Sequence, residues 1–302
     1  MTRGQRGATT KRMQCPTVQR DIAKVLLRLH AEVRRTLASQ LAGGGSNVDG
    51  AQFLGKNRKG DRQRSFDVAV DVAVRRFLEE EFASGIILSE ESEDYRFGDT
   101  APAYRFIVDP VDGSDNWARG LPLSSVAVAV LTAEGPIALG QVVASLVGAL
   151  DEEIPIVATR GEGAHRGAKR LQASGTRRIA DAFISCELNH FAPTVQVGEL
   201  FSTARAVRSY GCASRAIALV ACGAIDAHID VRSRLTPESF LAAAAILREA
   251  GGCVLDSQGN TLDKFEDLCQ TTTIVATATE KLARVIIDAL RGQRRVDQTR
   301  GR

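Results

Sequence analysis

The sequence lacks the features of several specialised protein classes. It has no run of about 18 apolar residues, so we expect no membrane-spanning helix. Its basic N-terminus lacks the apolar segment of a secretory signal. The six cysteines form no C-x-x-C pair, the four histidines form no H-E-x-x-H motif, and no internal repeat is visible. What remains is an ordinary globular protein, and we expect it to be cytoplasmic with reduced, mostly buried thiols.

The net charge of +3 is unevenly distributed along the chain. Residues 1–18 carry +4 and residues 291–302 carry another +4, so removing these eight charges from +3 leaves −5 for the body. Short basic ends of this kind predict two disordered tails, 1–18 and 291–302. Because only the tails are basic, we expect no specific nucleic-acid partner.

The period of the apolar residues changes in an orderly way. With 302 residues, of which 44% are apolar, the chain can bury one large core or two fused ones. Helical spacing predicts helices near 18–41, 65–82, 194–203, 237–252 and 280–290, and a further one between the strands of 204–231. Apolar runs predict strands near 85–92, 104–110, 124–132, 137–146, 182–188, 252–256 and 273–277. The mixture has no strict βαβ repeat, which indicates an α+β fold with much antiparallel sheet.

Two of the predicted strands end in acidic residues. "GIILSEES" ends in Glu90 and its neighbour, and "YRFIVDP" ends in Asp109, with Asp112 close behind. Carboxylates at the ends of neighbouring strands meet at one sheet edge, and magnesium prefers oxygen ligands. Pro110 should fix a turn that lets both aspartates face one point and leaves the Val111 carbonyl free as a further ligand.

The next residues, "GSDNW", look like the start of a helix. Its backbone N–H groups, with Gly113 allowing close approach, would form a phosphate seat, and Ser114 adds a hydroxyl beside it. Each fragment alone is common: "SEES" is usually a solvated loop, and D-P-x-D-G can be a plain turn. Their order, directly after apolar strands, favours a metal and phosphate site.

These motifs together resemble the inositol monophosphatase family of magnesium-dependent, lithium-sensitive sugar phosphatases. "SEES", "VDPVDGSDNW" and "REAGG" are similar to that family's G-E-E-S, D-P-x-D-G-T-x-N-F and E-A-G-G strings. "GKNRKGDRQRSFDVAVD" and "AIDAHIDVRSRL" resemble most the archaeal-type branch, whose members often hydrolyse both inositol 1-phosphate and fructose 1,6-bisphosphate. The resemblance covers about residues 20–290. It implies a layered α-β-α-β-α sandwich, usually a homodimer, with a metal-binding half at 19–175 and a substrate half at 176–290.

The resemblance also assigns site residues. It implies two or three magnesium ions, with the ligands Glu90, Asp109, the Val111 carbonyl and Asp112. Asp67, on the second predicted helix, would pair with Ser114 to orient an attacking water and accept its proton. The amides of Gly113 and Ser114 would hold the phosphate oxygens.

One departure from the family pattern concerns the helix that ends in "EAGG". The family has a metal-binding aspartate in its first turn, where this chain has Ser239. Thr236 and Pro237 predict the helix start, which puts Glu238 in the first turn, one position before the expected aspartate. Two interpretations stay open. In the first, the longer side chain of Glu238 reaches the metal. In the second, its negative charge only interacts favourably with the positive end of the helix dipole.

The predicted function is magnesium-dependent hydrolysis of a phosphomonoester, inositol 1-phosphate or a related sugar or polyol phosphate. Fructose 1,6-bisphosphate is the alternative substrate, and an adenosine bisphosphate is third. Asp230 would accept sugar hydroxyls, and Arg208 or another nearby arginine would hold a second phosphate. A different class stays open, a catalytically weakened binding protein on the phosphatase scaffold. Residues 43–64 are expected to form a mobile lid. The resemblance implies a third, loosely bound metal in this region, with Asp61 as the expected ligand.

Overall fold

The computed structural model of the protein describes residues 16–42, 52–60 and 62–292. Its α-helices are α1 (Pro16–Ala42), α2 (Ser65–Glu81), α3 (Ser114–Ala118), α4 (Val195–Thr203), α5 (Ala213–Ala221), α6 (Pro237–Glu249) and α7 (Glu280–Leu290). Its strands are β1 (Phe53–Lys56), β2 (Arg62–Arg64), β3 (Gly85–Ser89), β4 (Tyr95–Phe97), β5 (Tyr104–Asp112), β6 (Ser125–Thr132), β7 (Val142–Ala149), β8 (Ile156–Thr159), β9 (Gly163–Arg166), β10 (Lys169–Arg170), β11 (Phe183–Cys186), β12 (Ala206–Arg208), β13 (Ala227–Leu235), β14 (Cys253–Leu255) and β15 (Thr272–Thr277). Within these ranges, no helix is both long and apolar enough to cross a membrane.

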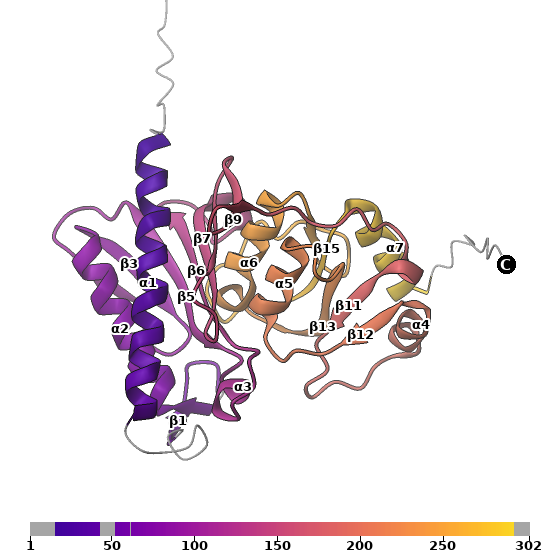
Figure 1. Cartoon of the computed structure of the whole chain (residues 1–302), viewed down its shortest axis with the longest axis horizontal. Coiled ribbons are helices and arrows are strands. Elements are labelled where there is room, and N and C mark those ends of the chain that lie inside the picture. The colour runs from indigo at the N-terminus through magenta and orange to yellow at the C-terminus, as the bar shows by residue number, and fades with distance from the viewer. Residues whose placement is uncertain (1–15, 43–51, 61, 293–302) are drawn as a thin grey trace, which may run out of the picture.

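The helices and sheets stack in five layers. Figure 1 shows α1 and α2 on the outer face of one sheet, α5 and α6 between the two sheets, and α4 and α7 beyond the second sheet. The larger sheet has eight strands in the order β10-β9-β8-β7-β6-β5-β3-β4, and the smaller has five in the order β12-β11-β13-β15-β14. This arrangement confirms the predicted α-β-α-β-α sandwich.

Burial explains why these segments form these layers. On α1, Ile22, Leu26 and Leu29 recur at helical spacing and are at most 2% exposed, because this stripe packs on the larger sheet. Strand β6 is buried over almost its whole length, since helices cover both faces of its sheet. Each fully buried aliphatic side chain of this kind stabilises the fold by roughly 1.5–3 kcal/mol.

One strand pairing brings the acidic strand ends together. The larger sheet is antiparallel throughout except for β3 and β5, which lie side by side and run parallel. Ser89 pairs with Val108, so the residues that follow them, Glu90 and Asp109, emerge at the same edge. The parallel pairing of β3 and β5 thus brings the two acidic strand ends to one edge, as expected from the sequence.

A β-bulge, and not a turn, aims the two aspartates of "DPVD". Strand β5 continues through Asp112, but its register against β6 shifts: Asp109 faces Ala127 and Asp112 faces Ser125. Residues three apart in a regular strand point to opposite faces. The extra residue of the bulge, at a proline that cannot donate to the ladder, returns both aspartates to one face.

The region before α2 differs from the sequence-based expectation. Residues 43–64 were expected to form one long loop, whereas β1 and β2 form an antiparallel hairpin within it. Residues 43–51 and Asp61 lie outside the described residues, so the predicted metal role of Asp61 is not addressed. The short strands β4, β8, β9 and β10 were not predicted either. Most of the two predicted tails, 1–15 and 293–302, also lies outside the described residues, and α1 begins at Pro16.

Candidate active site

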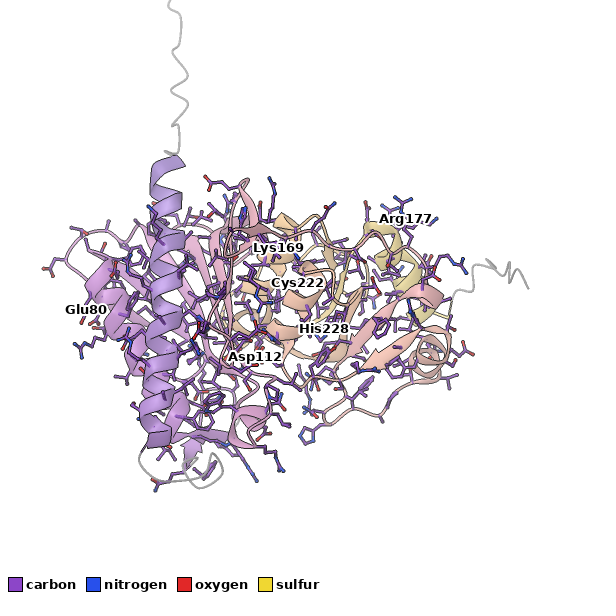
Figure 2. The ribbon with its side chains drawn as sticks, viewed as in Figure 1. Glu80, Asp112, Lys169, Arg177, Cys222 and His228 are labelled. Carbon is purple, nitrogen blue, oxygen red and sulfur yellow. The ribbon has the colours of Figure 1, made fainter. Side chains whose placement is uncertain are left out.

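Four carboxylates from three elements form what we call the acid cluster: Glu90, Asp109, Asp112 and Glu238. Glu90 follows β3, Asp109 and Asp112 belong to β5, and Glu238 lies in the first turn of α6. In Figure 2, Asp112 lies between the larger sheet and the second half of the chain. Burial, and then the charges of Glu90, Asp112 and Glu238, raise the pKa of Asp109 well above its usual value. The predicted acids of both halves therefore act on one another.

Lys59, from the turn of the β1–β2 hairpin, reaches into this cluster. Its Nζ lies 2.6 Å from Glu238 Oε1 and 2.7 Å from Glu90 Oε1. It also donates a hydrogen bond of 3.1 Å to Thr236 Oγ1. Burial opposes the charged form of Lys59, but Glu90 and Glu238 raise its pKa well above the usual value. The ammonium group is thus held as a cation between two carboxylates.

Glu238 does not behave as a surface acid at a helix start. It is 1% exposed, and besides Lys59 it accepts a hydrogen bond from the Thr236 hydroxyl. Thr236 is the N-cap residue of α6, as predicted, but its side chain bonds to Glu238 and does not cap the helix. Burial raises the pKa of Glu238 in spite of Lys59. The geometry favours a role in the cluster over a role limited to the helix dipole.

Ser214, in the first turn of α5, fixes the orientation of Asp112. Its backbone N–H and its hydroxyl donate to Asp112 Oδ2 at 2.7 and 2.6 Å. Burial raises the pKa of Asp112 to about 6, and these hydrogen bonds hold it below what burial alone would give. One oxygen of Asp112 is therefore committed to the protein, which leaves the other for a ligand.

The cluster has the chemistry of a site for a hard cation. Asp109 Oδ1, Glu238 Oε2 and the nearby Asp67 Oδ1 are buried and have no hydrogen-bond partner. Buried carboxylate oxygens are costly unless a cation or donor satisfies them. Among the described residues, no three acidic, histidine or cysteine side chains already converge on one ion position. The carboxylate oxygens of the cluster are the kind of ligand that magnesium prefers. The ammonium group of Lys59 lies between two of these carboxylates, Glu90 and Glu238.

Asp67 lies on α2 next to the cluster. It is 1% exposed, and its Oδ2 accepts a 2.9 Å hydrogen bond from the backbone N–H of Arg64. Burial, followed by the charge of Glu91, raises its pKa to about 8. Glu91 is affected in the same way: burial, then Glu90, raises its pKa to about 7. Carboxyl groups with pKa values raised in this way suit the role of a general base.

The expected direct pair between Asp67 and Ser114 is replaced by a bridge. Arg64 donates from its backbone to Asp67 and from Nη1 to Ser114 Oγ, the latter at 3.1 Å. Arg64 also bonds through Nη2 to Asp115. The guanidinium reaches the serine because Arg64 lies at the junction of β2 and α2, beside the start of α3.

Gly113 allows the close approach of two loops at the predicted phosphate seat. Its φ of 79° lies in the left-handed region, and a Cβ there would come within 3.0 Å of Cys212 Cβ and of the Leu123 carbonyl oxygen. Asn116, one turn later, donates from Nδ2 to the Tyr210 carbonyl at 2.7 Å. The start of α3 is thus packed tightly against the loop before α5, and Val111 lies buried in the adjacent bulge.

Two predicted substrate-binding residues lie apart from the acid cluster. Asp230 is 0% exposed, and both of its carboxylate oxygens bond to the Arg232 guanidinium. It is therefore not presented to a sugar hydroxyl as expected. Arg208 is exposed, donates to the Val207 carbonyl and lies over the ring of Phe183, 5.9 Å from its centroid. The hydrogen bonds of Asp230 and Arg208 go to other residues and not to the acid cluster.

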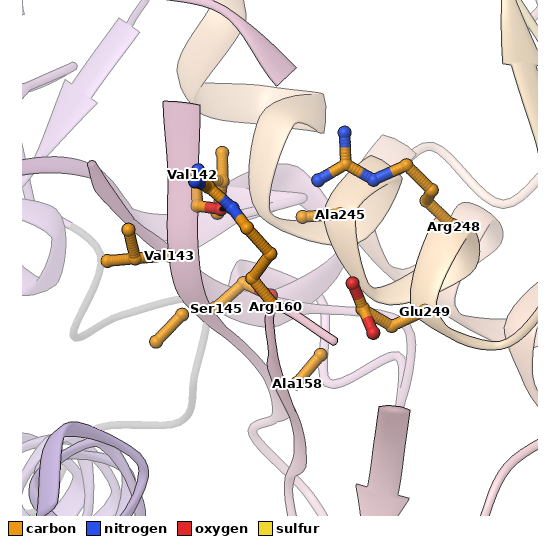
Figure 3. A pocket seen from close by; sticks show the side chains of 9 residues that line it. Val142, Val143, Ser145, Ala158, Arg160, Ala245, Arg248 and Glu249 are labelled. Carbon is orange, nitrogen blue, oxygen red and sulfur yellow. Dashed lines mark hydrogen bonds between the residues drawn. The ribbon is translucent and has the colours of Figure 1, made fainter. Parts of the chain in front are cut away.

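A small cavity lies at the other end of α6. It has a volume of ≈ 10 Å³ and is lined by residues of β7, β8 and α6, among them Ser145 and Glu249, and by Arg160, which directly follows β8. Figure 3 shows Arg160 and Glu249 on opposite sides of it. Glu249 accepts hydrogen bonds of 3.1 Å from the backbone N–H groups of Gly161 and Gly163. The space suits one water molecule and is separate from the acid cluster.

Comparison with known proteins agrees with this geometry. The sequence profile of the family described as "Inositol monophosphatase family" matches residues 18–295. The chain belongs to the inositol monophosphatase family. Members of this family are phosphatases and generally depend on magnesium.

Individual relatives are more distant. The fructose-1,6-bisphosphatase/inositol-1-monophosphatase of Thermococcus kodakarensis is 26% identical over 244 residues, which cover 80% of this chain and 87% of the relative. The fructose-1,6-bisphosphatase of Pyrococcus furiosus is 27% identical over 247 residues, 81% of this chain and 89% of the relative. The crystal structure of the extragenic suppressor protein suhB from Bartonella henselae matches with a TM-score of 0.74 at 24% identity. That match covers 89% of this chain and 98% of the other, and it shows the same fold.

Three residues that the structure places at the site were not identified from the sequence. Lys59 and Arg64 lie in a polar stretch read as a lid, and Ser214 lies in a segment read as a helix and as part of the substrate side, with no role given to Ser214 itself. For Lys59 and Arg64 the signal was the likeness of "GKNRKGDRQRSFDVAVD" to the family, which marks the stretch without indicating which side chain points inward.

Proposed function

We propose that the protein is a magnesium-dependent phosphomonoesterase that hydrolyses inositol 1-phosphate or a related sugar phosphate. The observation that carries the proposal is the acid cluster, in which buried carboxylate oxygens of Asp109 and Glu238 lack partners beside the Gly113–Ser114 turn. Membership in a phosphatase family supports it.

The proposed metal ligands are Glu90, Asp109, the Val111 carbonyl, Asp112 and Glu238. When bound, magnesium supplies positive charge that offsets the phosphate and lowers the pKa of an attacking water. The proposal gives Asp67 the task of accepting the proton of that water, since its pKa of about 8 makes it a stronger base than an ordinary carboxylate.

The remaining residues position the substrate. The backbone N–H groups of Gly113 and Ser114 would hold the phosphate oxygens while negative charge redistributes, with attack in line with the leaving oxygen. Ser214 keeps Asp112 in place through two hydrogen bonds to one oxygen. Phosphate monoesters are among the slowest bonds to break in water, so catalysis requires that the reacting groups are held in a fixed geometry.

Inositol 1-phosphate and fructose 1,6-bisphosphate are the two substrates that the relatives favour. Their names pair these activities in one archaeal protein. We place inositol 1-phosphate first and fructose 1,6-bisphosphate as the alternative, and we propose a homodimer as the assembly. Comparing kcat/KM for the two compounds decides between them, and a preference for an adenosine bisphosphate would overturn both.

The test of the function is phosphate release by purified protein in magnesium with each compound. We expect Asp112→Asn to abolish release while thermal unfolding stays cooperative, because the change removes a charge from the cluster without changing size. Asp99→Asn, at an exposed position, is the matched control and should keep full activity. Full activity of a folded Asp112→Asn protein would remove the metal proposal. Absence of activity in the unaltered protein would favour the binding-protein alternative.

A further inference from the structure

Arg64 occupies a position that helix capping does not explain. It is the N-cap residue of α2, where side chains that accept a hydrogen bond are preferred. A guanidinium has five donors and no acceptor, so it cannot cap the helix with its side chain. The backbone N–H of Arg64 is already satisfied by Asp67 at 2.9 Å. The side chain is therefore available for another purpose.

The partners of the Arg64 guanidinium are weak for so buried a cation. The Arg64 side chain is 12% exposed, but the carboxylate it bonds, Asp115, is 82% exposed. Its other partner is the neutral hydroxyl of Ser114, 3.1 Å from Nη1. An ion pair with one member in open solvent contributes little and is screened by salt. The acid cluster has Lys59 as its cation, and the buried Asp67 feels the charge of Arg64, which lowers the pKa of Asp67 against the larger effect of burial.

The guanidinium lies beside the position proposed for the phosphate group, because it bonds to Ser114 at the proposed phosphate seat. Ser114 follows Gly113 directly and lies two residues after Asp112, so a phosphate held by these amides would come within reach of Arg64. The planar fork of arginine matches two phosphate oxygens at once. The exposed Asp115 carboxylate would leave and the phosphate would take its place on the same nitrogen.

We propose that Arg64 binds the phosphate group of the substrate, and that Asp115 occupies the guanidinium until the phosphate arrives. This inference rests on the proposed function and deepens it, because it adds a phosphate-binding side chain that does not depend on a metal. Two substitutions then have opposite effects. Loss of Arg64 weakens phosphate binding, and loss of the Asp115 charge strengthens it.

The experiment measures the affinity for inorganic phosphate in magnesium by calorimetry, and by the fluorescence of Trp117, the single tryptophan, which lies in α3. We expect Arg64→Gln to weaken binding by about tenfold or more, since a charge-assisted contact is lost. Arg64→Lys should lie between, because it keeps the charge and loses the fork. Asp115→Asn should tighten binding by roughly two- to fivefold. Arg62→Gln, an exposed arginine on the same strand, is the control and should leave binding unchanged.

Each result bears on the inference. Unaltered phosphate affinity in Arg64→Gln or in Arg64→Lys, or weaker binding in Asp115→Asn, would show that Arg64 only joins α2 to α3. If Arg64→Gln does not fold, Arg64→Lys and Asp115→Asn still decide. If the unaltered protein hydrolyses phosphomonoesters but Arg64→Gln binds phosphate equally well, this inference fails and the proposed function stands. If the unaltered protein neither binds phosphate nor hydrolyses phosphomonoesters, both fail.

Discussion

Lys59 and Glu238 form a buried ion pair, with Nζ 2.6 Å from Oε1, although one comes from the β1–β2 hairpin and the other from α6. Glu238 is the acid nearest in sequence to the position where the family has a metal-binding aspartate. The pair therefore links the departure from the family pattern to the acid cluster, and the first two predictions address its members.

Glu238→Ala should lower activity by about tenfold or more if Glu238 holds magnesium, because removal of groups that support a metal site has effects of this size. The measurement is the dependence of the rate on magnesium concentration. Ser239→Asp, which restores the family residue, should lower the magnesium requirement. If neither variant changes that dependence, the start of α6 does not shape the metal site.

Lys59→Gln should increase the affinity for magnesium. The ammonium group lies between Glu90 and Glu238, and removing a buried positive charge makes the site more attractive to a cation. Calorimetric titration with magnesium, in the absence of substrate, should show binding tighter by several-fold. Lys56→Gln, at an exposed position on β1, is the matched control. Weaker magnesium binding in Lys59→Gln would mean that the lysine supports the metal.

Gly113→Ala should destabilise the protein more than Gly161→Ala. Both glycines have φ close to 78°, so an alanine at either costs roughly 1–2 kcal/mol of backbone strain. Only at Gly113 would the added Cβ also meet Cys212 and the Leu123 carbonyl at 3.0 Å, whereas nothing lies within 4 Å at Gly161. Urea unfolding of the two variants measures the difference, and equal losses would contradict the close packing at α3.

His228 should make the protein lose stability in mild acid. It is 1% exposed, and burial lowers its pKa from 6.5 to about 4, with Asp230 opposing and Arg232 adding to the shift. Below pH 6.5 the histidine is protonated in the unfolded chain but stays neutral in the folded protein. The free energy of unfolding therefore falls as the pH drops toward 4. The loss amounts to about 3 kcal/mol. Urea unfolding between pH 7 and 4 should show a flatter dependence for His228→Gln, and an unchanged slope would assign the loss to other groups.

The parts of the site that could be predicted from sequence are those with local causes. Glu90 and Asp109 each follow a continuous apolar run, and such runs are identified by their length and composition. The helix start at Thr236 and Pro237 was predicted correctly for the same reason, since caps depend on adjacent residues. The predicted elements indicated an α+β fold, and the order of the five layers was implied by the family resemblance.

The remaining parts depend on contacts between segments far apart in the chain. Nothing local to Lys59 indicates that it meets Glu238, and nothing local to Arg64 indicates Ser114. Asp230 was expected to accept sugar hydroxyls because it lies in "AIDAHIDVRSRL", a string that resembles the family, but Arg232, two residues later, bonds to it. The "DPVD" segment was read as a turn because proline favours turns. In the structure a β-bulge within strand β5 points both aspartates to one face instead.

The insertion of α6 between the two sheets sets when the site can form during folding. Glu90, Asp109 and Asp112 are synthesised in the first half of the chain, but Ser214 and Glu238 arrive only with α5 and α6. A ribosome-bound chain that ends before α6 would carry an incomplete and mutually repelling set of carboxylates. Contacts of such long range form late, so a cation that requires all of them stabilises only the finished molecule and cannot guide the folding of its first half.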